Sequence, residues 1–375
     1  MKPFLLFICC VAIASCSQQK QNLNFLEVAL SSDNAKIKRV IDSIDNYQVQ
    51  IKYTQIDRKN DSVIFTDYDF QVNDSMYFYP ASTVKFPTAV LALEKLNKID
   101  SLSIQTKYYV EGDTIESTFA KDISEIFAVS DNLANNRLVE FLGFEAINQN
   151  LREKGISPVR ITHRLGHRSD DLRTKPLIIY INDSTTGITS FILNKTPDEL
   201  ELLEIKKGVG YYENEELVEV PFNFSQKNYY PISSQHNVLK RILFPNNFEE
   251  TERFHISAEQ RNFLLEAMHT VPQKAGYDAT TYYDSYCKFF LYGDSKENIP
   301  EHLEIYNKVG FAYGTLTDCA YVKDTENNVE FLLTATILVN KDGIFNDDAY
   351  EYEEIGIPFL AQLGREIYHQ ELNRK

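Results

Sequence analysis

The chain has 375 residues, 43% of them apolar and 13% aromatic, which is enough for one large domain or two smaller ones with a sizeable core. Its formal net charge of −16 argues against a nucleic-acid partner and against electrostatic attachment to an anionic membrane, because both need a basic surface. The sequence has no CxxC pair or Cys/His cluster typical of structural zinc, so we expect no metal and no cofactor.

The N-terminus has the pattern of an export signal. Lys2 precedes an uncharged apolar run, 4–14, which is far shorter than the roughly 18 residues that span a bilayer. The run ends at Ala14-Ser15-Cys16 and a polar stretch follows, which resembles a bacterial lipobox. An ordinary signal peptide that happens to contain cysteines is the alternative. We expect residues 1–16 to be a lipoprotein signal peptide with Cys16 as the lipidation site, residues 17–31 to be a tether, and the protein to be exported and membrane-anchored, facing the periplasm or the cell surface.

The remaining residues, 32–375, predict a single domain with helices and strands. A helix capped at 32–34 precedes a hairpin of two strands, and a strong helix covers 82–96. More helices follow to about residue 156, and residues 177–232 form an insertion with some strand content. After the insertion we expect helices at 236–244 and 257–269, strands at 305–308, 313–323 and 329–339, and a terminal helix at 355–372. We therefore predict an α+β fold. One antiparallel sheet, flanked by N- and C-terminal helices, forms a lobe from 32–81 and 275–375, and 82–274 forms a helical lobe, with a cleft between the two.

The first chemical signal is an S-x-x-K sequence, Ser82 to Lys85. Because Ser82 opens a helix, free backbone N–H groups nearby can stabilise an oxyanion. Lys85 lies one turn further on the same face, so its amine can take the proton of the serine hydroxyl, which is a weak nucleophile without a base. The same pattern occurs at Ser17 and Ser285. On this motif alone, the favoured interpretation is Ser82 as a helix cap and Lys85 as a solvated charge.

An S-D-N sequence follows in the helical middle of the chain. The Ser130 hydroxyl is suited to passing a proton to a leaving nitrogen, and Asn132 to holding a substrate amide and orienting Lys85. A second S-D-N at residues 32–34 is explained by helix capping.

A K-x-G sequence, Lys308-Val309-Gly310, comes last. Lys308 on an edge strand would attract a substrate carboxylate, and Gly310 would let a substrate backbone lie close to the strand. The same pattern recurs at Lys206 and Lys341.

In this order the three patterns resemble those of class A β-lactamases and penicillin-binding proteins. The resemblance covers about residues 35–370, interrupted by the insertion, and is closest at 79–87 and 308–320. It implies a β-lactamase/transpeptidase-like fold, with Ser82 as the acylated serine, Lys85 as its base and Ser130 as the proton shuttle. It also implies that Asn132 binds the substrate amide, that Lys308 lies on the carboxylate side, and that the backbone N–H groups of Ser82 and Phe311 form the oxyanion hole.

The sequence departs from the family in two places. Val309 stands where the family has Thr or Ser, so a hydroxyl that would bond the substrate carboxylate is missing, worth about 1.5–3 kcal/mol. In the loop that carries E-x-x-L-N in the family, Ser169 stands at the glutamate and Arg173 at the asparagine. Asp170 would substitute for the glutamate only if the loop shifted by one residue, and Asp is shorter.

Three functions are consistent with these residues. The first is a serine hydrolase that opens β-lactams through an acyl-enzyme and deacylates slowly. The second is a peptidase acting on the D-Ala-D-Ala ends of peptidoglycan stem peptides, and the third is a binding protein that keeps the fold without turnover. The intact motifs argue against the third, and the missing glutamate leaves room for the second. Pairing of Cys287 with Cys319 stays open, and the acidic run at 347–354 predicts a solvated loop.

Overall fold

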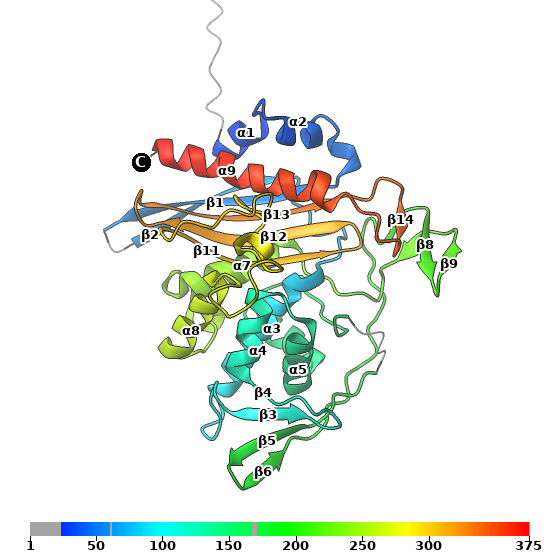
Figure 1. Ribbon diagram of the computed structural model, residues 1–375, viewed down its shortest axis with the longest axis vertical. Helices are drawn as coiled ribbons and strands as arrows, with labels where there is room; N and C mark the ends of the chain where they lie inside the picture. Colours follow the sequence, from blue (N-terminus) through cyan, green and yellow to red (C-terminus); the bar gives the residue numbers. More distant parts are fainter. Residues whose placement is uncertain (1–23, 61, 167–170, 375) are drawn as a thin grey trace, which may run out of the picture.

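A five-stranded antiparallel sheet forms the centre of the molecule in the computed structural model, which describes residues 24–60, 62–166 and 171–374 (Figure 1). Its strand order is β11-β12-β13-β1-β2. The pairing of β1 with β13 joins the two ends of the chain in one sheet, which confirms the predicted fold class. The strands are β1 (Gln50–Lys59), β2 (Ser62–Phe70), β11 (Leu303–Ala312), β12 (Thr315–Asp324) and β13 (Val329–Leu338).

Helices from both chain ends cover one face of the sheet (Figure 1). These are α1 (Phe25–Leu30), α2 (Ala35–Ile41) and α9 (Ile357–Arg374), with α1 and α2 packed on α9 and α9 packed on β13. The tether prediction for 17–31 is therefore wrong at α1. Asn24 caps that helix, and its buried side chains join the apolar core beneath α9. A six-residue helix is too short to show a hydrophobic period in sequence.

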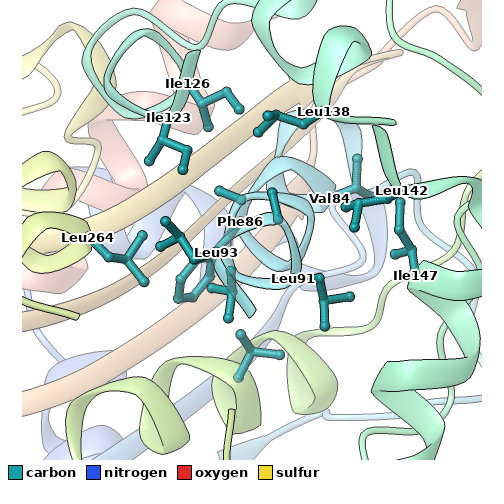
Figure 2. Close-up of a cluster of buried hydrophobic side chains, with 14 of the residues drawn as sticks. Val84, Phe86, Leu91, Leu93, Ile123, Ile126, Leu138, Leu142, Ile147 and Leu264 are labelled. Carbon is teal, nitrogen blue, oxygen red and sulfur yellow. The ribbon is translucent and has the colours of Figure 1, made fainter. Parts of the chain in front are cut away.

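The helical lobe lies on the opposite face of the sheet and surrounds α3 (Lys85–Leu96). Because nearly all of its side chains are buried, including those of Lys85, Thr88 and Glu94, α3 is a central helix of the lobe. Figure 2 shows its side chains packed among those of neighbouring helices. Those neighbours are α4 (Phe119–Ala128), α5 (Asn132–Leu142), α6 (Phe144–Glu153) and α8 (Ala258–His269). The predicted lobe boundary at 82–274 also enclosed α7 (Ile232–Leu243), but α7 packs directly on β1, β12 and β13.

The insertion does not form a separate unit. Its first part, β5 (Leu177–Asn182) and β6 (Thr185–Ile188), extends a small sheet begun by β3 (Lys107–Val110) and β4 (Ser117–Thr118). Its second part forms a two-stranded sheet, β7 (Lys206–Lys207) with β10 (Phe222–Asn223), and a hairpin of β8 (Gly210–Glu213) with β9 (Glu216–Val218). The hairpin pairs in parallel with β14 (Ile344–Phe345), so the insertion is joined to the C-terminal part of the chain.

Within the described ranges, no helix combines the length and the apolar character that a bilayer span requires. The predicted signal peptide and Cys16 lie outside the described residues.

Candidate active site

The predicted nucleophile lies on a short turn, not on the α-helix itself. Ser82 belongs to the 3₁₀ turn η2 (Ala81–Val84), which leads directly into α3. Ala81 has a left-handed backbone, φ +46°, which is strained for a residue with a Cβ atom. The Thr83 hydroxyl donates to the Pro80 carbonyl at 2.7 Å and closes the turn. The turn therefore presents the half-buried Ser82 to a cleft of about 400 Å³.

Lys85 is fully buried beneath the turn and contacts the S-D-N segment. Its ammonium donates to the Ser130 carbonyl, to Asn132 Oδ1 at 2.6 Å and to Ser130 Oγ at 3.2 Å. Burial lowers the pKa of Lys85 well below its ordinary value, and the charge of Lys308 lowers it further. The partners of the Lys85 amine in this structure are thus Ser130 and Asn132. No hydrogen bond to the Ser82 hydroxyl is found among the described residues.

Ser130 lies between two lysines. Lys308, on β11, donates to Ser130 Oγ at 2.9 Å and to the Val309 carbonyl at 2.8 Å. Burial lowers the pKa of Lys308 to about 8. Ser130 itself has a left-handed backbone, φ +58°, at the corner between α4 and α5, and that corner turns its hydroxyl and its carbonyl to the lysines. A hydroxyl between two amines of lowered pKa is well suited to relaying protons.

Gly310 is the point at which β11 meets the nucleophile turn. A Cβ atom at this position would lie 2.6 Å from the Pro80 carbonyl oxygen and 2.9 Å from the backbone nitrogens of Ser82 and Thr83. The glycine thus lets the strand backbone approach the turn, in addition to any role beside the substrate. The next residue, Phe311, lines the cleft and is 51% exposed.

The missing hydroxyl of the K-x-G motif has an apolar replacement. Val309 is 1% exposed and packs in the core on the helix-covered face of the sheet, together with Cys287. Cys287 and Cys319 are both buried and free, so they do not pair.

A buried polar network supports the strand behind Lys308. Asn307 donates to the Asp318 carboxylate at 2.8 Å and accepts from Lys288 at 2.8 Å. The other Asp318 oxygen accepts from the backbone N–H groups of Phe289 and Phe290. Burial raises the pKa of Asp318 to about 6 and lowers that of Lys288 to about 8.

The duplicate motifs have structural roles. Ser285 is buried and donates to the Ser295 carbonyl at 2.5 Å, while Lys288 belongs to the network of Asn307. Asn34 caps α2, as its place before that helix predicts. Of the S-x-x-K sequences in the described residues, only the one at Ser82 faces a cleft together with Asn132.

Sequence reasoning missed one wall of the cleft. Tyr79 and Tyr313 line it, and each flanks a recognised motif, so proximity in sequence was an available signal. The predicted solvated loop at 347–354 instead contributes Asp348, Tyr350 and Tyr352 to the lining and includes a π-helical turn, η6 (Tyr352–Gly356). No hydrophobic period marks such a segment in the sequence.

The base of the loop after α6 is well defined. Arg164 forms a bidentate pair with Glu140 of α5, at 2.6 and 2.9 Å, and also donates to the carbonyls of Asp171 and Arg173. Gly166 packs against Asn132, since a Cβ atom there would lie 2.7 Å from its Nδ2. Ser169, which stands at the position of the family's glutamate, and Asp170, its possible substitute, lie outside the described residues.

Comparisons with known proteins agree with this geometry. Residues 34–190, which contain Ser82, Lys85, Ser130 and Asn132, match the model of the β-lactamase enzyme family. A solved β-lactamase from Sphaerobacter thermophilus has a TM-score of 0.53 at 12% identity, covering 93% of this chain and 97% of that one. A class A β-lactamase from Bacteroides cellulosilyticus has a TM-score of 0.53 at 14% identity, covering 91% and 98%.

The chromosome-encoded β-lactamase of Vibrio parahaemolyticus has a TM-score of 0.52 at 14% identity, covering 88% of this chain and 96% of that one. A comparison with curated protein sequences gave no match. The fold expected from the three motifs is therefore confirmed, and the segment with the nucleophile is similar to the β-lactamase enzyme family.

Proposed function

We propose that this β-lactamase-like chain is a serine hydrolase that reacts with β-lactams through an acyl-enzyme on Ser82. Ser82 and Asn132 line one cleft. Lys85 is hydrogen-bonded to Asn132 and shares the Ser130 hydroxyl with Lys308. The observation that carries the proposal is Ser130 Oγ held between the amines of Lys85 and Lys308, beside the nucleophile turn. Burying two lysine amines beside one hydroxyl is electrostatically unfavourable, and a purely structural role gives no reason for that arrangement.

The acylation step follows from these positions. The Ser82 oxygen attacks the carbonyl carbon, and its proton passes to the neutral amine of Lys85, whose lowered pKa favours that form. The backbone N–H groups of Ser82 and Phe311 stabilise the oxyanion. As the C–N bond breaks, the Ser130 hydroxyl gives its proton to the leaving nitrogen, and the lysines restore it.

Deacylation is expected to be slow. Water must be activated by a base on the far side of the ester, and class A enzymes use a glutamate there. With Ser169 at that position by sequence, about 10²–10⁴-fold of rate is lost, or roughly 3–5 kcal/mol of barrier. The adduct should therefore accumulate. This feature favours, as the second candidate, a peptidase of the penicillin-binding type that acts on stem peptides ending in D-Ala-D-Ala.

Intact-protein mass spectrometry over time, with a penicillin, tests both steps. The wild-type mass should increase by that of the whole penicillin and return slowly. Ser82→Ala should not react, whereas Ser285→Ala, the buried duplicate, should react normally. Ser169→Glu should speed the return. Labelling that survives Ser82→Ala would remove the proposal, and rapid wild-type turnover lost in Asp170→Asn would assign the base to Asp170 instead. Reversible binding with no mass change would indicate a binding protein.

We also propose that the protein is exported and anchored by a lipid on Cys16. The proposal rests on the short apolar run and the small residues before that cysteine. Cys16→Ser should abolish a lipid mass on the mature N-terminus and release the protein from the membrane fraction. Wild-type protein that fractionates as soluble, without a lipid, would refute it.

A further inference from the structure

The nucleophile's cleft continues into a larger hollow built by the insertion. This hollow, of about 1140 Å³, lies between the β8–β9 hairpin and the loop after β14. It shares Tyr79, Gly166, Tyr313, Asn346 and Asp348 with the cleft, so the two lie side by side. Sites for compact ligands occupy about 300–1,000 Å³. The cleft alone is in that range, and the added hollow gives room for a longer molecule.

The wall of the hollow is fixed by aromatic packing. The ring centroids of Tyr313 and Tyr79 are 4.9 Å apart in an edge contact, and those of Tyr313 and Phe222 are 5.4 Å apart. Phe222 in turn makes an edge contact with Tyr211, with ring centroids 5.0 Å apart. Backbone hydrogen bonds join the β8–β9 hairpin to the C-terminal part of the chain, where the Val209 N–H donates to the Gly343 carbonyl at 2.8 Å. Gly208 permits this approach, because a Cβ atom there would lie 2.1 Å from that oxygen. The hollow is therefore preformed by residues that are distant in sequence.

The direction of a bound substrate follows from β11. This strand is at the edge of the sheet, with β12 as its neighbour, so its outer edge can pair with an extended peptide. At its Lys308 end the lysine is 2% exposed and bonded to Ser130, whereas Phe311 is 51% exposed and lines the cleft. We therefore place the smaller, leaving part of a substrate at the Lys308 end. The acyl part then runs past Phe311 toward Tyr313 and into the hollow.

We propose that this hollow is a subsite for the acyl-side arm of an extended peptide substrate, several residues longer than the scissile amide. The proposal rests on the proposed reaction at Ser82 and names the class of substrate that this site would take. Tyr212, which is 38% exposed, and the other aromatic rings of the wall supply faces for side chains of the arm. The hollow is lined by four acids, Glu213, Glu215, Asp347 and Asp348, against Lys227 and against Arg164, which is paired with Glu140. An arm with lysine should therefore bind better than one with glutamate.

Binding to the Ser82→Ala protein, measured by calorimetry, separates this proposal from turnover. The probes are N-acetyl-D-Ala-D-Ala, an acetylated hexapeptide with the same C-terminus and a lysine in its arm, and the same hexapeptide with glutamate in place of lysine. The lysine hexapeptide should bind at least about tenfold more tightly than the short probe. In the Ser82→Ala protein that also carries Tyr212→Ala, the two peptides should bind with nearly equal affinity. Val220→Ala, on the same insertion, 53% exposed and outside the hollow, should keep it.

Equal affinity of the short and long peptides, no measurable binding of the hexapeptide, or a ratio unchanged by Tyr212→Ala would overturn the subsite. Equal binding of the two hexapeptides would overturn its preference for charge. Penicillin labelling of the wild type is measured separately. Absence of labelling with a retained ratio of peptide affinities would reject the acylation at Ser82 and leave the subsite standing.

Discussion

The contact between Gly310 and the nucleophile turn leads to a quantitative prediction for Gly310→Ala. The new Cβ atom would lie 2.6 Å from the Pro80 carbonyl oxygen, so the strand and the turn must separate by about 0.8 Å to reach 3.4 Å, where ordinary van der Waals contact begins. The opposing atoms are all backbone and cannot rotate away. Overpacking of this kind costs about 1–3 kcal/mol. A displacement near 1 Å of a reacting group costs about 10²-fold in rate.

We therefore expect Gly310→Ala to fold with a lowered denaturation midpoint and to be acylated by a fluorescent penicillin about 10–100-fold more slowly than wild type. Gly187→Ala is the matched control, because its Cβ would meet only the flexible end of Ile181, at 3.3 Å. Stopped-flow labelling and urea denaturation measure the two effects. A Gly310→Ala protein with wild-type acylation and stability would refute the argument that this contact sets the position of Ser82.

Three further predictions concern charge. The acylation rate should rise as the pH rises through the lowered pKa of Lys85, because only the neutral amine accepts a proton. Lys308→Met removes a neighbouring positive charge, so it should move this rise in the pH–rate profile to higher pH. A rise that stays at the same pH would contradict the coupling of the two lysines. Glu140→Gln leaves the buried Arg164 poorly paired and should cost about 3–5 kcal/mol in urea denaturation, against at most about 1 kcal/mol for Glu145→Gln in an exposed pair; equal losses would argue against a buried clamp. Because burial raises the pKa of Asp318 from 3.8 to about 6, the folded state takes up a proton there, and the stability from this group is present below about pH 4 and lost as the pH rises through about 6. The stability difference between wild type and Asp318→Asn should therefore change across that window, and parallel curves would count against it.

Much of the fold could be predicted because its signals are local. The hairpin of β1 and β2, the helix that follows Ser82 and the apolar strand β13 each have a clear period or a long apolar run. Helix α1 was missed because six residues carry no measurable period. The loop after β14 has the composition of a solvated segment, because acids dominate it, although its tyrosines line the cleft.

The sequence by itself determined which residues could carry the chemistry and in what order, because a nucleophile, its base and a proton shuttle need particular side chains at short spacings along a helix or loop. Ser82, Lys85, Ser130, Asn132 and Lys308 are identified by three short motifs, by the order of those motifs along the chain and by their resemblance to class A β-lactamases. Only the tertiary structure decided how they meet. The Lys85 amine is bonded to Ser130 and Asn132, and Gly310 lies against the Pro80 carbonyl. The insertion, which has no period of its own, becomes a wall of the site because its aromatic rings pack on Tyr79 and Tyr313. Contacts between residues this far apart in sequence form only when strands from both chain ends pair in one sheet, and no local sequence pattern predicts that pairing.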